Sequence, residues 1–408
     1  MSFGLYVHLP YCRSICPYCA FATAPLRRAE PERLLAALAR ELDGARRVEA
    51  SHPGIRPDEA WRRPRTIYIG GGTPTALDPG TLARLLGWMH AAFDLTAVRE
   101  WTVEANPEGL EEGTLRLLRE AGADRLSLGI QSLEPGVLKT LGRTHDAATS
   151  LDAVDRARAA GFDRLSVDLM VAVPGETEVG LLAGLDALLS RGVGHVSAYS
   201  LQVEEGTPFA AKAARGALAV PGDDVAADRY ALLDGRLGRA GLVHYEVSNY
   251  ARRGEESRHN EGYWIRRPYL GLGPGAHSFD GFRRWANEHD TRRYMARIES
   301  AGDAREGETT VEPRDAAEEE IFLALRRTRG IRRARLFALA GPAAAAWVDW
   351  GIAAGALTSA PPGRIRPTAR GLLTAHELAT ELFLRMPPSP RSDLQAEQRN
   401  RTTPAGAP

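Results

Sequence analysis

The three cysteines of the 408-residue chain, Cys12, Cys16 and Cys19, lie within eight residues of one another. Clustered thiolates are soft ligands that suit iron or zinc. Three thiolates are one fewer than a closed structural zinc site or an ordinary iron–sulfur cluster uses, so another ligand must complete the site. The spacing allows one loop to hold three corners of a four-iron cluster and leaves one iron open to a small chelating molecule.

Two other chemistries fit the same residues. A zinc ion with His8 as its fourth ligand is one, although we expect His8 to lie on the preceding strand, which makes this geometry awkward. A group of reactive thiols is the other. The neighbouring rings of Tyr18 and Phe21 are placed to shield a cluster from solvent.

The first half of the chain alternates short apolar runs with longer helical patterns, which is typical of βα units with parallel strands. Six such repeats predict most of a (β/α) barrel. We expect strands at residues 5–9, 66–69, 100–104, 125–130, 164–171 and 195–201, and helices at residues 31–48, 81–93, 112–121, 147–160 and 178–190.

Polar or glycine-rich residues follow these strands, where the carboxyl ends of barrel strands converge on one face. Any one of them has an ordinary explanation, since polar residues are common at strand ends. Five coincidences favour a shared site. The residues concerned are the cysteines, the GGGTP segment at 70–74, Glu104, Gln131 and Asp168.

We predict an α/β fold in which a partial (β/α)6 TIM-like barrel carries an accessory α+β layer and a small winged-helix-like C-terminal domain. The expected boundaries are 1–215 for the barrel, 216–300 for an accessory region associated with the ligand, 301–386 for the C-terminal domain and 387–408 for a disordered tail. The tail lacks apolar periodicity.

The composition is that of an ordinary globular protein, with 44% hydrophobic and 25% charged residues. The 52 basic and 52 acidic residues cancel, which argues against a general nucleic-acid-binding role. The sequence shows no leader pattern at its start and no long apolar run. We therefore expect a cytoplasmic protein, in which clustered thiols stay reduced and favour metal over disulfide.

The C-x3-C-x2-C pattern, with an aromatic residue before its last cysteine, resembles the radical S-adenosylmethionine (SAM) superfamily. The resemblance implies that Cys12, Cys16 and Cys19 hold a [4Fe-4S] cluster whose open iron binds the amino and carboxylate groups of SAM. The GGGTP segment resembles the glycine motif that contacts the amino group. Taken alone, it would also suit a tight βα turn.

Over residues 3 to about 290 the chain resembles the oxygen-independent coproporphyrinogen III oxidase family. The segments that carry this resemblance are GIQS, LGRTH, LSVDLMVAVPGET and GLGPGAHSF. We expect Arg143 to pair with the carboxylate of SAM in a bidentate fork. The implied SAM-binding residues are Tyr6, Tyr18, Gly71, Gly72, Thr73, Glu104, Gln131, Arg143 and Asp168.

Two departures separate the chain from those oxidases. They carry a further cysteine where this chain has Phe21, and an N-terminal arm that we do not find before the first strand. The HNEGYW segment instead resembles the H-N-x-x-Y-W motif of HemW-type heme chaperones, which implies a heme site at His259, Asn260, Tyr263 and Trp264. Imidazole is a usual heme ligand, whereas the ordinary alternative is a surface histidine beside loop-anchoring aromatic rings.

The resemblance implies a heme chaperone that binds heme, a [4Fe-4S] cluster and SAM and delivers heme to acceptor proteins such as respiratory enzymes. Its expected partners are those acceptors and an electron donor such as flavodoxin or ferredoxin. A transient contact with membrane proteins and a homodimer are also compatible with it. Two enzymatic alternatives stay open: decarboxylation of coproporphyrinogen III, which we do not expect, and radical chemistry on another substrate.

Overall fold

The protein, described here by a computed structural model at residues 2–50 and 61–387, forms two compact units that divide between Thr310 and Val311. The first unit is built on a sheet of twelve strands in the order β14-β13-β12-β11-β1-β4-β5-β6-β7-β8-β10-β9. Six consecutive strands in this order, β1 and β4 to β8, are all parallel. The predicted partial (β/α)6 barrel is therefore confirmed.

The strands of this barrel agree with the predicted ranges to within two residues at every end. They are β1 (Phe3–Leu9), β4 (Pro64–Gly71), β5 (Glu100–Ala105), β6 (Arg125–Gln131), β7 (Arg164–Val171) and β8 (His195–Ser200). The helices that join them are α1 (Pro31–Ala50), α2 (Pro79–Ala92), α3 (Glu112–Glu120), α4 (Pro135–Thr140), α5 (Ala147–Ala159) and α6 (Glu178–Ser190).

Side-chain caps fix where several of these helices begin. Asp78, Asp146 and Thr177 each accept a hydrogen bond from the backbone N–H three residues later, at the starts of α2, α5 and α6. Such caps satisfy donors that the first turn leaves free. The short helix α4 was not predicted, because its six residues are too few to show a helical period.

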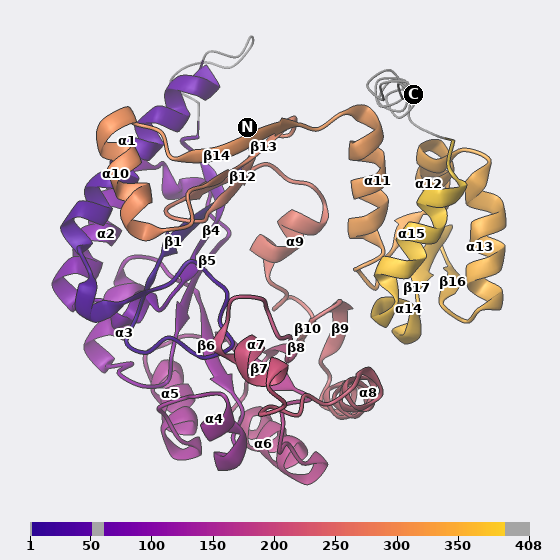
Figure 1. Ribbon diagram of the computed structural model, residues 1–408, viewed down its shortest axis with the longest axis horizontal. Helices are drawn as coiled ribbons and strands as arrows, with labels where there is room; N and C mark the ends of the chain where they lie inside the picture. Colours follow the sequence, from indigo (N-terminus) through magenta and orange to yellow (C-terminus); the bar gives the residue numbers. More distant parts are fainter. Residues whose placement is uncertain (1, 51–60, 388–408) are drawn as a thin grey trace, which may run out of the picture. The chain divides into compact units, whose positions relative to one another are not determined.

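Alternation along the strands places the apolar core on the outer face of the barrel. Successive strand residues point to opposite faces, and on each strand one set is apolar and packs against the helices. Figure 1 shows α1 to α6 on one side of the curved sheet and α9 on the other. The buried apolar set includes Leu5, Val7, Leu9, Ile67, Ile69, Trp101, Val103, Leu126, Leu128, Leu165, Val167, Val196 and Ala198.

Both flanks of the barrel are extended by later parts of the first unit. The strand β11 pairs with β1 in parallel, and β12 to β14 then continue antiparallel, while β10 and β9 extend the sheet beyond β8. The expected accessory region 216–300 thus contributes strands to the same sheet. The elements of the first unit that follow β8, of which α7 lies before this region and β14 after it, are α7 (Pro208–Ala214), α8 (Asp223–Arg239), β9 (Val243–Glu246), β10 (Asn249–Ala251), α9 (Arg258–Trp264), β11 (Tyr269–Leu272), β12 (His277–Phe279), β13 (Arg283–Asn287), α10 (Thr291–Ala301) and β14 (Arg305–Thr310).

The remaining elements of the first unit are short. A pair of two-residue strands, β2 (Tyr11–Cys12) and β3 (Ala24–Pro25), closes the base of the cysteine loop. Three single-turn helices are η1 (Leu26–Arg28), η2 (Pro74–Ala76) and η3 (Leu95–Ala97).

The second unit has its own apolar core and a three-stranded antiparallel sheet in the order β15-β17-β16. Trp347 is fully buried, and its Nε1 donates a hydrogen bond to the backbone oxygen of Leu378 at 2.9 Å. The predicted tail lies almost wholly outside the described residues. The elements are α11 (Pro313–Ala324), β15 (Ile331–Arg332), α12 (Arg333–Ala340), α13 (Ala343–Ala353), β16 (Leu357–Ala360), β17 (Arg364–Pro367), α14 (Ala369–Leu373) and α15 (Ala375–Arg385).

None of the helices within the described ranges combines the length and the apolar character that crossing a membrane would require.

The outward apolar face makes a quantitative prediction about stability. Leu128 on β6 is fully buried in the helix-packed core, so Leu128→Ala should lower the free energy of unfolding by about 2–5 kcal/mol. Thr309→Ala on the exposed edge strand β14 is the matched control and should change it by no more than about 0.5 kcal/mol. Chemical denaturation measures both, and equal effects would contradict the assignment of the core face.

Candidate functional site

The inner face of the barrel is polar, unlike the branched apolar filling of most βα barrels. Residues that alternate with the apolar core carry hydroxyls, imidazoles or charged groups, or are glycines, and cross-strand register places them in layers. The barrel interior therefore suits a polar ligand or a hydrogen-bonded network. From the N-terminal strand ends upward, these residues are Gly4, Tyr6 and His8 on β1, Thr66, Tyr68 and Gly70 on β4, Glu100, Thr102 and Glu104 on β5, Arg125, Ser127 and Gly129 on β6, Arg164, Ser166 and Asp168 on β7, and His195, Ser197 and Tyr199 on β8.

The cysteine loop follows β1 at the C-terminal end of the strands. The backbone N–H of Cys19 donates to the oxygen of Cys16 at 3.1 Å, which folds the middle of the loop into a turn. Tyr18 packs against Phe209, with ring centroids 6.0 Å apart, whereas Phe21 is 70% exposed. All three cysteines are free and partly buried, so they are available as metal ligands.

Polar donors approach all three sulfur atoms, and the Cys19 thiol has the Thr23 side chain and the backbone N–H of Phe21 as partners. The Arg143 Nη1 lies 3.3 Å from the Sγ of Cys16, and the Thr73 hydroxyl lies 3.7 Å from the Sγ of Cys12. Burial raises the pKa of Cys12 to about 11 and also raises the pKa of Cys19. Thiols of this kind ionise when a metal replaces their protons, and the nearby donors stabilise the resulting thiolates.

Three free thiols on one loop suit a cluster. Within the ranges 2–50 and 61–387, no group of three His, Cys, Asp or Glu side chains is arranged to hold a single metal ion. A cluster does not need such an arrangement, because each cysteine binds a different iron.

His8 is held by other protein atoms. Its Nε2 lies 2.8 Å from the carbonyl oxygen of Ala22, and its Nδ1 lies 2.9 Å from the hydroxyl of Tyr6. Since a carbonyl oxygen only accepts, Nε2 carries the proton and Nδ1 accepts from Tyr6. Burial lowers the pKa of His8 to about 4. His8 therefore serves as a neutral support of the barrel interior, and its geometry does not favour the zinc alternative.

The glycine segment packs directly against the cysteine loop. The backbone N–H groups of Gly72 and Thr73 donate to the oxygens of Leu9 and Tyr11, at 2.7 and 2.9 Å. A Cβ atom on Gly72 would lie only 2.6 Å from the carbonyl carbon of Pro10. Glycine is thus required here for close approach of two backbones.

Two carboxylates face the interior near this segment. Glu104 accepts hydrogen bonds from the Tyr68 hydroxyl at 2.7 Å and from the backbone N–H of Gly71 at 3.0 Å. Burial raises its pKa to about 7. Asp168 accepts from the Ser127 hydroxyl at 3.3 Å, and burial likewise raises its pKa.

Arg143 and Gln131 occupy the adjacent strand end. The Nη2 of Arg143 donates to Asn106 Oδ1 at 2.6 Å and to the Gly129 oxygen at 2.8 Å, while its buried Nε has no partner. Gln131 has a positive φ of 68°, which is uncommon for a residue with a side chain. The structure therefore places Thr73, Glu104, Gln131 and Arg143 at the end of the barrel that carries the cysteines, whereas Tyr6 lies in the middle of β1 beside Tyr68.

Asn106 was not among the predicted site residues, although it lies two residues after Glu104. Its Nδ2 donates to the Thr73 hydroxyl at 2.9 Å, and its Oδ1 accepts from Arg143. It thereby connects the two donors that approach Cys12 and Cys16. A bridging amide has no signature of its own in a single sequence, since only the fold brings its partners together.

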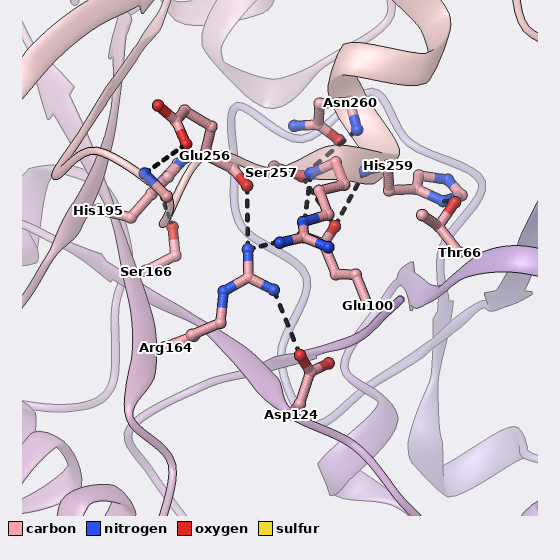
Figure 2. A network of polar contacts seen from close by, with 12 residues as sticks. Thr66, Glu100, Asp124, Arg164, Ser166, His195, Glu256, Ser257, His259 and Asn260 are labelled. Carbon is pink, nitrogen blue, oxygen red and sulfur yellow. Dashed lines mark hydrogen bonds and ion pairs between the residues drawn. The ribbon is translucent and has the colours of Figure 1, made fainter. Parts of the chain in front are cut away.

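The HNEGYW segment forms most of α9, and its first residues, His259 and Asn260, lie close to Glu100 at the start of β5 (Figure 2). The Nδ1 of His259 is 2.9 Å from the Thr66 hydroxyl, and its Nε2 is 2.8 Å from the Tyr263 hydroxyl. The imidazole is buried, which lowers its pKa to about 4. Thr66 lies near the start of its strand, whereas the cysteines follow a strand end, so the structure does not bring His259 together with the cysteines.

A buried carboxylate anchors α9. Glu100 accepts from the backbone N–H groups of Arg258 and His259, each at 2.9 Å, and pairs with Arg164 at 2.8 Å. Figure 2 shows this network, with Ser257 beside it at the start of the helix. Nothing in the sequence except its position at the start of a strand distinguishes Glu100, so its role in holding α9 could not be predicted.

The GLGPGAHSF segment supports β1 from outside the barrel. The backbone N–H of Gly273 donates to buried Glu41 at 2.8 Å, and Gly273 has a φ of 105°. A cavity of about 210 Å³ lies beside this support and is lined by residues including Glu41, Trp61 and Trp285. None of the predicted site residues lines it.

Comparisons with known proteins show the family and the fold of the chain. The sequence profile of the radical SAM superfamily matches residues 6–183. The chain is 40% identical over 338 residues to the heme chaperone HemW of Mycobacterium tuberculosis, covering 82% of this chain and 84% of that protein, and 34% identical to HemW of Bacillus subtilis, covering 81% and 85%. The solved structure of coproporphyrinogen III oxidase from Escherichia coli superposes with a TM-score of 0.78 at 21% identity, covering 93% of this chain and 89% of that one.

The close approach at Gly72 predicts how the cysteine loop is held. Gly72→Ala should lower the free energy of unfolding by about 1–3 kcal/mol, because the new Cβ displaces the Pro10 backbone. The same shift should speed the reaction of the thiols with a disulfide reagent. Gly87→Ala in α2, which has nothing within 4 Å, is the control and should leave thiol reactivity unchanged. Identical behaviour of the two variants would show that the contact is dispensable.

Proposed function

Because the chain belongs to the HemW family of radical SAM proteins, we propose that it is a heme chaperone that hands heme to acceptor proteins such as respiratory enzymes. The single observation that carries this proposal is its identity of 34–40% with proteins named heme chaperones over more than four fifths of their length. The proposed place of action is the cytoplasm, where the three thiols stay reduced.

The proposed cluster ligands are Cys12, Cys16 and Cys19. The Arg143 guanidinium and the Thr73 hydroxyl lie beside two of these sulfurs, where they stabilise thiolates and exclude water from them. When bound, a [4Fe-4S] cluster supplies one electron to SAM, and a protein such as flavodoxin or ferredoxin would replenish it.

The proposed SAM site is the polar interior between the cysteine loop and the paired tyrosines Tyr6 on β1 and Tyr68 on β4. The carboxylates of Glu104 and Asp168 are placed to accept hydrogen bonds from amino or hydroxyl groups. The unpartnered Nε of Arg143 offers a donor for a carboxylate, although its two Nη atoms already contact protein atoms. The remaining proposed contacts are Tyr6, Tyr18, Gly71, Gly72, Thr73 and Gln131.

Phe21 supports the chaperone over the oxidase. It is exposed beside the cysteine loop, at the position where the resemblance places a further cysteine in coproporphyrinogen oxidases. A phenyl ring cannot ligate metal or transfer a proton, so any role of that cysteine is lost here.

The heme site is proposed at α9, with a condition set by its geometry. Asn260 and Trp264 are partly buried, and the buried Nε1 of Trp264 has no partner, so both offer contacts. Axial ligation by His259 would require that the imidazole give up its bonds to Thr66 and Tyr263.

The cluster assignment predicts the outcome of removing one thiol. Cys16→Ala should abolish the brown cluster absorption after anaerobic reconstitution, because two thiolates cannot hold three corners of the cluster. Ser14 lies in the same loop but is not a proposed metal ligand, so Ser14→Ala should retain the cluster absorption. Full iron content in Cys16→Ala would contradict the ligand set.

The chaperone proposal predicts the behaviour of the reconstituted protein toward two tetrapyrroles. Heme titration should give saturable binding with a shifted absorption band, and coproporphyrinogen III under anaerobic conditions should lose no carbon dioxide. Stoichiometric release of carbon dioxide would instead establish the oxidase alternative. Dependence of deoxyadenosine formation on an added compound that is not a porphyrin would establish a different radical enzyme.

A further inference from the structure

His259 is connected to the opposite end of the barrel by a short chain of contacts. Its ring lies against the ring of Tyr68, with centroids 5.3 Å apart and planes tilted by 35°. The Tyr68 hydroxyl donates to Glu104 at 2.7 Å. One aromatic side chain therefore spans the distance from α9 to a carboxylate of the proposed SAM site.

The imidazole of His259 packs closely against the backbone of β1 at Gly4. A Cβ atom on Gly4 would lie 3.2 Å from the imidazole Cε1, so a larger residue there would crowd the ring. Thr66 and Tyr263 hold both ring nitrogens, and Glu100 holds the backbone N–H. The imidazole is thus fixed in rotation and in position.

We propose that His259 is a positioning residue for SAM, which holds the Tyr68 ring so that its hydroxyl donates to Glu104. The inference rests on the proposed function, in which Glu104 contacts the cofactor. It assigns the first residue of the H-N-x-x-Y-W segment a task other than binding iron.

The hydrogen bond from Tyr68 to Glu104 can be followed through the pKa of Glu104, which depends on the groups around it. Burial raises the pKa of Glu104 to about 7 and the facing Asp168 raises it, whereas the Tyr68 hydrogen bond, the Gly71 N–H and Arg125 lower it. Tyr6, Tyr199 and Tyr263 also face it. Loss of the Tyr68 donor therefore raises the pKa of Glu104 further, and the ionised carboxylate forms only at higher pH.

SAM affinity should depend on pH through the ionisation of Glu104. An ionised Glu104 accepts hydrogen bonds from the amino or hydroxyl groups of SAM more strongly than the neutral acid does, so affinity should be highest above pH 7 and fall as the pH drops through it. Any variant that releases Tyr68 should move this fall to higher pH. A variant that merely loosens the fold would lower stability without moving the midpoint.

The test uses the full chain, anaerobically reconstituted, with SAM dissociation constants measured between pH 5.5 and 8.5. Thr66→Val and Tyr263→Phe each remove one ring partner and leave the imidazole in place, and Tyr68→Phe removes the donor itself. Each should weaken SAM binding about 2- to 10-fold, as expected for one hydrogen bond, and shift the acid midpoint upward. Ile265→Ser, at an exposed position just after α9, is the matched control and should change neither.

Heme titration of His259→Gln separates the two roles of the imidazole. The positioning role predicts weakened SAM binding with an unchanged heme spectrum. Unchanged SAM affinity and acid midpoint in His259→Gln, Thr66→Val and Tyr263→Phe would overturn it, and a lost heme spectrum in His259→Gln alone would identify the imidazole as the heme ligand. If the unaltered protein bound no SAM at all, the proposed function would fail before the positioning role was at issue, so the two failures are distinguishable.

Discussion

Charged side chains buried inside a barrel destabilise it unless each has a partner of opposite charge or a hydrogen-bond donor. At the N-terminal end of this barrel, Glu100 pairs with Arg164 and accepts hydrogen bonds from the backbone of α9. Burial by itself would raise the pKa of Glu100, but Arg125, Arg164 and the two N–H groups of α9 hold it below its usual value. The ionised carboxylate therefore stabilises the fold at neutral pH, and this contribution is lost as the pH falls through its depressed pKa. Removing one member of such a buried pair typically costs about 3–5 kcal/mol. The site at the other end of the barrel depends on this anchor, because it shares the same strands.

The upper end of the barrel is organised around donors rather than around apolar packing. Asn106 joins Thr73 and Arg143, which in turn approach Cys12 and Cys16. The glycine segment lies against the cysteine loop with no room for a side chain. These contacts fix the loop before any metal arrives, which is the kind of support that oriented metal ligands need. The same fold is seen in coproporphyrinogen III oxidase, so what distinguishes the chain must lie in particular residues such as Phe21.

Much of this architecture could be predicted from the sequence, because its strands and helices carry strong periodic patterns. The six barrel strands and five of their helices were located correctly, and Glu104 and Arg143 lie at the end of the barrel that carries the cysteines, where the strand-end argument places the proposed SAM site. The helix α9 was missed, since seven residues rich in aromatic rings and glycine show no helical period. The orientation of His259 could not be read either, because its partner Thr66 lies 193 residues away in the sequence and only the fold brings them together. Asn106 and Glu100 were overlooked for the same reason.

Heme transfer from this chain to a heme-free acceptor is the most direct test of the proposed chaperone function. Heme-loaded protein would be mixed with a heme-free respiratory cytochrome, and the absorption band of the acceptor followed against an equal concentration of free heme. A heme chaperone should fill the acceptor faster than free heme does, and the acceptor should gain its activity. Heme that stays on the chain, or reaches the acceptor no faster than free heme does, would contradict the proposed function.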